Sequence, residues 1–225
     1  MALQDLSIDV PLGEVHGLIG PNGAGKTTAI NVATGFYVPD SGTVRMFDRD
    51  VSKLAPHSRA ALGFGRTFQG ARLFAGLDVR TNLAIAIEQR RRHDGQAASK
   101  AEIRRESDAL LNAVGLESHA DTDARLLPYG RQKVLEILRA LAFASSVLLL
   151  DEPAAGLSED EIDTILKLVM QHRDRLAILI VEHNMDVVMS ACDRVTVIDA
   201  GRMLSSGTPA QVQADPAVVS AYLGS

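Results

Sequence analysis

Residues Gly20 to Thr27 follow the pattern G-x-x-x-x-G-K-T, which is the spacing of a phosphate-binding loop. Glycines in such a loop accept positive φ angles and let backbone amides approach an anion closely. Lys26 would then reach the β- and γ-phosphates of a nucleotide, and Thr27 would hold Mg²⁺. The predicted phosphate-binding residues are Asn22, Gly23, Ala24, Gly25, Lys26, Thr27 and Thr28.

The residues on either side of this loop support the same prediction. Val15 to Ile19 is short, apolar and β-branched, as expected for a buried strand. Thr27 to Thr34 can form a helix that ends at Gly35, with its N-terminus facing the nucleotide. A glycine-rich turn that binds nothing is the alternative, and the strand and helix flanks favour the nucleotide site over it.

A second group of chemically capable residues follows the apolar run from Val147 to Leu150. Asp151 and Glu152 come directly after it, so they would lie at the carboxyl end of a buried parallel strand, where ligands bind in doubly wound sheets. Asp151 could bind the Mg²⁺ region, and Glu152 could polarise an attacking water as general base. A solvated strand end is the alternative; the preceding phosphate loop favours a catalytic role in phosphoryl transfer.

The composition restricts the possible classes of protein. A chain of 225 residues with 46% hydrophobic residues can form one α/β domain, or a core with one subdomain. A net charge of −5 argues against nucleic acid as the main partner, and the basic run Arg90 to Arg92 is expected to be a solvated helix end. Cys192 is the only cysteine, which excludes a disulfide framework. No run of 18 apolar residues occurs, so a membrane role would depend on a partner.

The order of the expected elements indicates how the chain is organised. Strands are expected at 6–10, 15–19, 43–47, 63–68, 147–150, 177–181, 195–198 and 203–205. Helices are expected at 27–34, 58–62, 78–92, 100–114, 131–142, 158–169, after 209 and at 218–223. From 69 to about 145 the pattern is mostly helical, between two segments that contain β-strands. We therefore expect an α/β domain with a core at 1–69 and 146–225 and an inserted helical subdomain at about 70–145.

Two further residues acquire a role from a family resemblance. The phosphate loop, the Asp151-Glu152 pair and their spacing make the chain similar to nucleotide-binding subunits of ATP-binding cassette (ABC) transporters. The resemblance implies that Gln69, after Arg66-Thr67-Phe68, contacts Mg²⁺ and water and leads into the segment that contacts the permease. It also implies that His183, after Ile180-Val181-Glu182, senses the γ-phosphate. The implied catalytic residues are Glu152, His183 and Gln69, and the implied metal ligands are Thr27, Gln69 and Asp151.

The family also carries a signature segment that caps the γ-phosphate of ATP bound by the opposite subunit. The matching residues here are Leu127, Pro128, Tyr129, Gly130, Arg131 and Gln132. Gly130 suits a close approach to phosphate, and the helix from Arg131 would point its N-terminus at the anion. Pro128 departs from the usual serine and removes both a hydroxyl and an N–H donor.

Several further segments of the sequence resemble those of the ATPase subunits of branched-chain amino-acid importers, and urea and short-amide importers share these segments. The segments that carry this likeness include Arg66-Thr67-Phe68-Gln69, Leu135-Glu136-Ile137, Val181-Glu182-His183-Asn184-Met185 and Gly207-Thr208-Pro209. The resemblance implies a P-loop NTPase core with a mixed sheet and a small antiparallel β part. It also implies ATP and Mg²⁺ as ligands and a peripheral position on the cytoplasmic face of the cell membrane.

The implied partners are a second ATPase subunit, identical or paralogous, an integral-membrane permease and, indirectly, a solute-binding protein, with no nucleic acid. A non-transport ABC ATPase that acts on ribosomes or DNA stays open as an alternative. So does a regulatory nucleotide binder with weak hydrolysis, which Pro128 favours.

One feature of the family has no counterpart in the sequence. ABC subunits stack adenine on an aromatic residue upstream of the phosphate loop, and no Phe, Tyr or Trp precedes Phe36. The expectation is that the start of the chain is truncated, that a partner supplies the missing strand, or that adenine is held less tightly. Loss of one stacking contact would weaken binding by roughly 1–3 kcal/mol.

Overall fold

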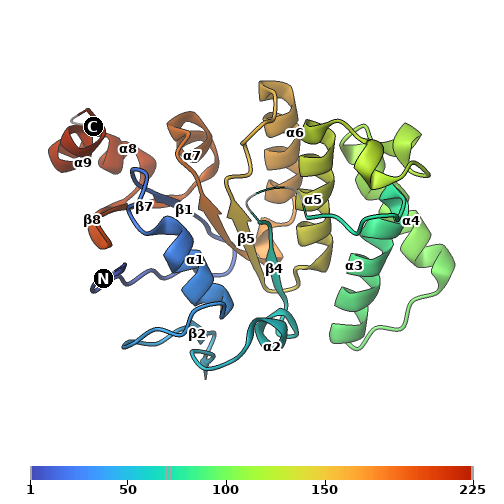
Figure 1. Ribbon diagram of the computed structural model, residues 1–225, viewed down its shortest axis with the longest axis horizontal. Helices are drawn as coiled ribbons and strands as arrows, with labels where there is room; N and C mark the ends of the chain where they lie inside the picture. Colours follow the sequence, from blue (N-terminus) through green and yellow to red (C-terminus); the bar gives the residue numbers. More distant parts are fainter. Residues whose placement is uncertain (1, 69, 71, 224–225) are drawn as a thin grey trace.

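A computed structural model describes residues 2–68, 70 and 72–223 of the chain (Figure 1). Its centre is a six-stranded sheet with the order β4-β5-β6-β1-β7-β8. The strands are β1 (Val15–Ile19), β4 (Phe64–Arg66), β5 (Val147–Asp151), β6 (Ala177–Val181), β7 (Arg194–Asp199) and β8 (Arg202–Gly207). All neighbours in this sheet are parallel except β7 and β8. The parallel strands therefore share one carboxyl edge, which is where the chemically capable residues are expected.

Helices flank the sheet, and a short hairpin lies beside it. The helices are α1 (Lys26–Thr34), α2 (Pro56–Ala60), α3 (Val79–His93), α4 (Lys100–Ala113), α5 (Tyr129–Phe143), α6 (Glu159–Met170), α7 (Met185–Ala191), α8 (Pro209–Gln213) and α9 (Pro216–Leu223). Short 3₁₀ turns cover Glu117–His119, Ala124–Leu126 and Arg173–Arg175. The antiparallel hairpin consists of β2 (Arg45–Met46) and β3 (Arg49–Asp50).

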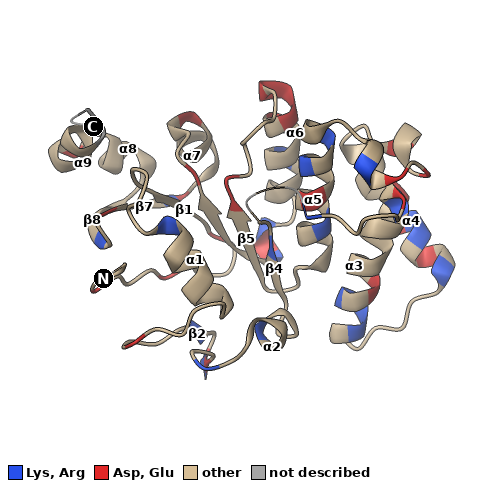
Figure 2. Cartoon of the chain, in the orientation of Figure 1, with Lys and Arg blue, Asp and Glu red and all other residues tan. Residues whose placement is uncertain are grey.

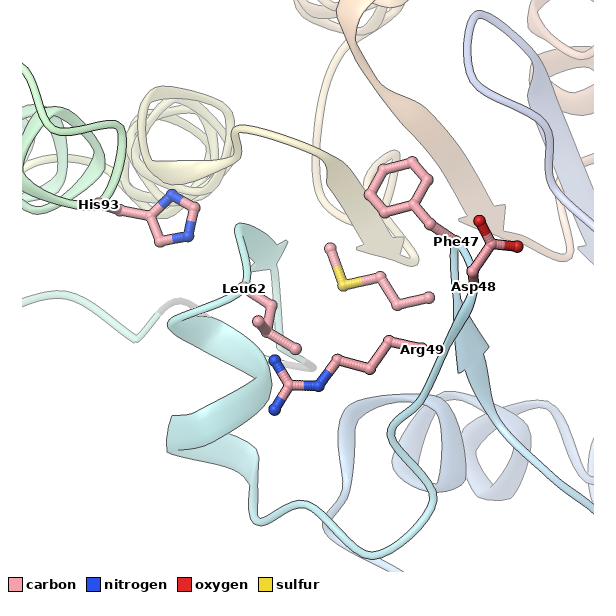
Figure 3. Close-up of a pocket in the computed structure, with 6 residues that line it drawn as sticks. Phe47, Asp48, Arg49, Leu62 and His93 are labelled. Carbon is pink, nitrogen blue, oxygen red and sulfur yellow. The ribbon is translucent and has the colours of Figure 1, made fainter.

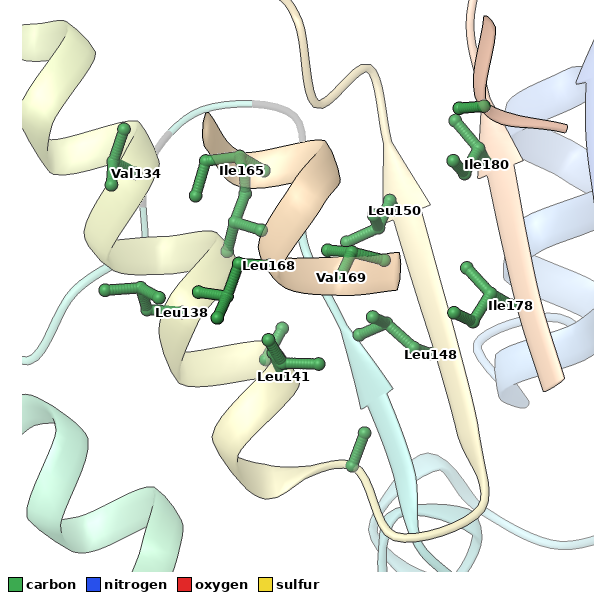
Figure 4. Packing of buried hydrophobic residues seen from close by; sticks show 14 of the residues in the cluster. Val134, Leu138, Leu141, Leu148, Leu150, Ile165, Leu168, Val169, Ile178 and Ile180 are labelled. Atoms are coloured by element: carbon green, nitrogen blue, oxygen red, sulfur yellow. The ribbon is translucent and has the colours of Figure 1, made fainter. Parts of the chain in front are cut away.

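The core lies on both faces of the sheet, as a continuous apolar strand requires. On one face, side chains of β5 and β6 pack against α5 and α6 (Figure 4). The labelled contacts include Leu148, Leu150, Ile178 and Ile180 of the strands, and Leu138, Leu141, Ile165, Leu168 and Val169 of the helices. On the other face, alternate strand residues such as Leu149 and Leu179 pack against Ile30 of α1. This packing fixes α1, and with it the phosphate loop, relative to the end of β5.

The strand expected at 6–10 is a wrong prediction, because the structure has no strand there. The alternation itself is real: Leu6, Ile8 and Val10 pack against the core, whereas Ser7 and Asp9 are exposed. A strand also needs a neighbour with which to exchange backbone hydrogen bonds, and within the described residues this segment pairs with none. Alternation therefore predicted side-chain burial correctly and strand pairing wrongly.

The region from α3 to α5 is helical, as expected, and α5 packs against β4 and β5 as well as against α3. The division of the chain into a core and a helical subdomain remains a prediction. The basic run differs from its expected role as a solvated helix end. Arg90 and Arg91 both form ion pairs with Glu106 of α4, whereas Arg92 is exposed. Two of the three arginines therefore join α3 to α4.

None of the described helices combines the length and apolar character needed to cross a bilayer.

Candidate active site

The loop between β1 and α1 is built around glycines. Gly23 has a φ of 82° and Gly25 a φ of 109°, in the region that side chains rarely adopt. At Gly20, a Cβ atom would lie 2.1 Å from the carbonyl oxygen of Ile198, so no other residue fits there. Gly25 precedes α1 and supplies no side-chain cap. The first-turn amides of α1 are consequently suited to an anionic ligand, and Thr27 is exposed beside them.

Lys26 is the first residue of α1, and only 7% of it is exposed. Its Nζ donates to the carbonyl oxygens of Gly20, at 2.6 Å, and of Pro21, at 3.0 Å. Burial lowers the pKa of Lys26, and the carboxylates of Glu152, Asp151 and Glu182 oppose that shift. Figure 2 shows the basic start of α1 and the acidic end of β5 at the same edge of the sheet. A buried ammonium group that bonds to neutral carbonyls is well placed to bind phosphate.

Asp151 ends β5, and residues of the neighbouring β4 region hold it in place. Its backbone N–H donates to Thr67 Oγ1 at 2.8 Å, and its Oδ2 lies 3.5 Å from Arg66 Nη2. Burial raises the pKa of Asp151, and the Arg66 guanidinium opposes that rise. Arg66 also donates to Asn31 Oδ1 and Thr34 Oγ1 of α1. Arg66 therefore fixes the carboxylate relative to the helix that begins with Lys26.

Glu152 follows with an unusual backbone conformation, a φ of 47°, in a region that costs free energy for a residue with a side chain. Its N–H still donates to the carbonyl oxygen of Val181, at 2.8 Å. Glu152 Oε1 lies 3.9 Å from Nδ1 of His183, whose side chain is 61% exposed. A carboxylate and an imidazole thus lie together where solvent reaches them, as a group that activates water requires.

Glu182 directly precedes His183 and was not among the predicted site residues. It is 1% exposed, and its carboxylate accepts the backbone N–H groups of Ala154 at 2.8 Å, His183 at 3.1 Å and Asn184 at 3.3 Å. Asp151 pairs with Val181 in register, so Glu152 and Glu182 both come directly after a paired position. An acidic residue after each of two buried strands was the available sequence signal. Glu182 holds the turn that carries His183.

The predicted signature segment begins α5. Pro128 precedes the helix without a side-chain cap, and Gln132 Nε2 donates to the carbonyl oxygen of Leu127 at 2.8 Å. Tyr129 lies against Gly156, where an added Cβ would come within 2.6 Å of the ring. Among the described residues, no hydrogen bond or ion pair joins 127–132 to the phosphate loop at 20–28. Within the described part of one chain, these two segments are therefore not bonded to each other.

The structure thus brings together Lys26 at the start of α1, Asp151 and Glu152 at the end of β5, and His183 just after β6. Gln69 lies outside the described residues. A hollow of about 680 Å³ lies elsewhere, beside the β2–β3 hairpin (Figure 3). It is lined by Met46, Phe47, Asp48, Arg49, Leu62 and His93. Because Leu62 comes just before β4, this hollow lies toward the amino ends of the strands, away from the edge that carries the acids.

Comparison with known proteins decides the family. The sequence profile described as "ABC transporter" matches residues 3–155, and the profile described as "Branched-chain amino acid ATP-binding cassette transporter" matches residues 202–225. The chain belongs to the ABC transporter family. As an ABC ATPase, it hydrolyses ATP, and its α/β P-loop fold agrees with the prediction from the sequence.

Relatives of this ABC ATPase include subunits of an amino-acid transport system and of an export system. It is 39% identical to the high-affinity branched-chain amino acid transport ATP-binding protein LivG of Salmonella typhimurium, across 100% of this chain and 92% of LivG. It is 33% identical to the lipopolysaccharide export system ATP-binding protein LptB of Acidithiobacillus ferridurans, across 100% of this chain and 91% of LptB. The ADP conformation of the ATP-binding cassette MJ1267 superposes with a TM-score of 0.83 at 30% identity, covering 100% of this chain and 93% of MJ1267.

Proposed function

We propose that this ABC ATPase energises the import of branched-chain amino acids or of a related small solute such as urea or an amide. The observation that carries the proposal is the meeting of Lys26, Asp151, Glu152 and His183 at one sheet edge, in a chain 39% identical to LivG. The match of residues 202–225 to the branched-chain amino-acid profile supports import.

Each residue has a role in this proposal that follows from its position. Lys26 and the α1 amides bind the phosphates, with Asn22, Gly23, Ala24, Gly25 and Thr28 completing the loop. Glu152 takes a proton from the attacking water, and His183, whose Nδ1 lies 3.9 Å from Glu152 Oε1, senses the γ-phosphate. Gln69 is proposed as a further contact of metal and water, as the family resemblance implies.

The residues at the site fit Mg²⁺ in the manner usual for nucleotide sites. Thr27 is exposed at the start of α1, and Asp151 ends the neighbouring β5. Among the described side chains, no cluster of three His, Cys, Asp or Glu residues could hold a metal on its own, and Mg²⁺ commonly binds one or two protein oxygens together with substrate phosphates. When bound, Mg²⁺ would neutralise charge on the β- and γ-phosphates.

We propose further that two subunits, identical or paralogous, face each other head to tail. Each ATP would lie between the Lys26 loop of one subunit and the Leu127–Gln132 segment of the other. The separation of these two segments within one chain supports this arrangement. An integral-membrane permease would hold the pair at the cytoplasmic face of the membrane, and a solute-binding protein would deliver the solute to that permease.

The substitution Glu152→Gln tests the hydrolytic assignment. It keeps the size of the side chain and removes the base, so ATP binding is expected to persist while phosphate release falls at least about 100-fold. The matched control is Glu159→Gln, an exposed acid in the first turn of α6, which should retain the wild-type rate. Near-normal turnover in Glu152→Gln would reject Glu152 as the base.

A second candidate function is export, because the chain is also 33% identical to LptB. Purification from the native membrane in mild detergent, with mass spectrometry of the accompanying proteins, separates the two candidates. Import predicts an importer-type permease, and export predicts the membrane subunits of an export system.

A further inference from the structure

A buried ion pair lies on α5, five and eight residues after Pro128. Nζ of Lys133 is 3.3 Å from Oε2 of Glu136, and each residue is only 1% exposed. Residues three apart share one face of a helix, so both side chains leave α5 in the same direction. Burying two charges is unfavourable unless their remaining donors and acceptors are also satisfied. The groups that satisfy them show what the pair holds.

Those groups are the backbone atoms of the segment directly after β4. Oε1 of Glu136 accepts the N–H of Phe68 at 3.1 Å and the N–H of Arg72 at 3.3 Å. Lys133 Nζ donates to the carbonyl oxygen of Phe68 at 3.3 Å. Phe68 is thus held through both its N–H and its carbonyl group by one helix. Hydrogen bonds to charged groups are about twice as strong as neutral ones, and both charged side chains here are buried.

The same residues connect onward to the acid at the end of β5. The Phe68 ring lies against the Arg66 guanidinium, at 4.8 Å, and Arg66 pairs with Asp151. Lys133 itself is near enough to Asp151 for its charge to lower the pKa of that carboxyl, against the larger effect of burial. Figure 2 shows charged residues of both signs along α5, the helix that connects these contacts to the 127–132 segment.

We propose that the Lys133–Glu136 pair is a positioning device that makes the Leu127–Gln132 segment and the Phe68 and Arg72 backbone move as one body. The inference rests on the proposed function, in which ATP held between two subunits displaces the 127–132 segment. A helix is stiff along its length, so a displacement at its start reaches Lys133 and Glu136 one to two turns later. The charged hydrogen bonds then carry it to Phe68, and through Arg66 to Asp151.

The first test needs no nucleotide. Amide hydrogen exchange of Phe68 and Arg72 is measured by NMR in the full chain, in wild type and in the double variant Lys133→Met/Glu136→Gln, which is neutral overall at this site. Loss of the charged contacts should speed exchange at both amides about tenfold or more. Glu136→Gln alone is the second variant, because it keeps Lys133 and its hydrogen bond to the carbonyl oxygen of Phe68. Once corrected for global stability, it should give a smaller increase than the double variant.

The control is Leu138→Ala, which removes a buried core side chain from the same helix. It should destabilise the chain as a whole and leave exchange at Phe68 and Arg72 slow relative to global unfolding. Equal acceleration in Leu138→Ala and in the double variant, once corrected for global stability, would overturn the proposal.

The second test adds a non-hydrolysable ATP analogue with Mg²⁺, whose binding is confirmed by equilibrium dialysis. In wild type, exchange should slow at Gly130 and Arg131 and also at Phe68 and Arg72. In the double variant it should slow only at Gly130 and Arg131. Slowing at all four amides in the double variant, or only at Gly130 and Arg131 in wild type, would overturn the coupling. A wild type that binds no analogue contradicts the proposed function instead, and the nucleotide-free test still decides whether the pair holds Phe68 and Arg72.

Discussion

Two lysines of this chain are buried near the ends of helices, and their surroundings differ. Lys26, at the start of α1, donates to two backbone carbonyl oxygens, and the nearby carboxylates act on it through space. Lys133, in α5, forms a direct ion pair with Glu136 and donates to Phe68. The first lysine has neutral partners that a phosphate group could replace at little cost. The second has a charged partner that it could not leave without exposing a buried carboxylate.

This difference separates a ligand-binding role from a positioning role. A buried charge without a direct counter-ion is held at a cost in stability, which an incoming anion removes. A buried charge with a counter-ion and further hydrogen bonds gives a fixed geometry, and breaking such a pair by removing one partner is strongly destabilising. Activity should therefore depend mainly on Lys26, and stability mainly on Lys133.

The largest expected effect is on turnover in Lys26→Met. In the proposed function this ammonium group contacts the transferring phosphate, so its removal should lower the steady-state rate of ATP hydrolysis at least about 100-fold. The free energy of unfolding should change little, because the lost hydrogen bonds are to neutral carbonyls. Enzyme assay and chemical denaturation measure the two quantities, and the exposed Lys53→Met serves as the control. A Lys26→Met chain that hydrolyses ATP normally would remove the distinction between the two lysines.

The next effect is on stability in Lys133→Met. The Glu136 carboxylate would stay buried without its counter-ion, which should lower the free energy of unfolding by about 3–5 kcal/mol. Lys133→Met combined with Glu136→Gln should recover much of that loss, since no unpaired charge remains. Urea denaturation of the single and double variants measures the coupling. If the free energy of unfolding of Lys133→Met falls by less than about 1 kcal/mol, the ion pair does not stabilise the fold as its burial indicates.

The smallest effect concerns Asp151 and depends on pH. Burial raises the pKa of this carboxyl in the folded chain. Its contribution to stability is therefore fully present below the unfolded pKa of about 3.9 and is lost as the pH rises through the higher folded pKa. Asp151→Asn does not titrate, although it also lacks the counter-ion of Arg66 at every pH. The gap between its free energy of unfolding and that of wild type should therefore shift in favour of the variant from pH 4 to pH 7. Denaturation curves at both pH values measure this difference in the free energy of unfolding. A shift in favour of wild type from pH 4 to pH 7 would contradict the prediction.

Local patterns were enough to predict part of this site. The phosphate loop is one continuous stretch, so its glycines, Lys26 and the start of α1 follow from neighbouring residues. Asp151 and Glu152 were found because parallel strands bring their carboxyl ends to one edge. Ala200 and Gly201 separate the two strands expected at 195–198 and 203–205, and positive φ angles at both residues suit a tight hairpin.

Contacts between distant segments were beyond the sequence patterns. Glu136 lies 68 positions from the amide of Phe68 that it accepts, and nothing near Glu136 in sequence indicates that bond. The strand expected at 6–10 was wrong for the same reason, since pairing is decided by a distant neighbour. The positive φ of Glu152 also has no signal in the neighbouring residues, and the chain just after it is held by a distant group, because the N–H of Ala154 donates to Glu182.

That conformation of Glu152 has a consequence for protein engineering. A left-handed backbone suits glycine better than glutamate by about 1 kcal/mol. Glutamate at position 152 therefore lowers the stability of the folded chain by about that amount. Selection of variants for heat resistance alone should therefore favour glycine over Glu152. A screen that also required phosphate release would keep it.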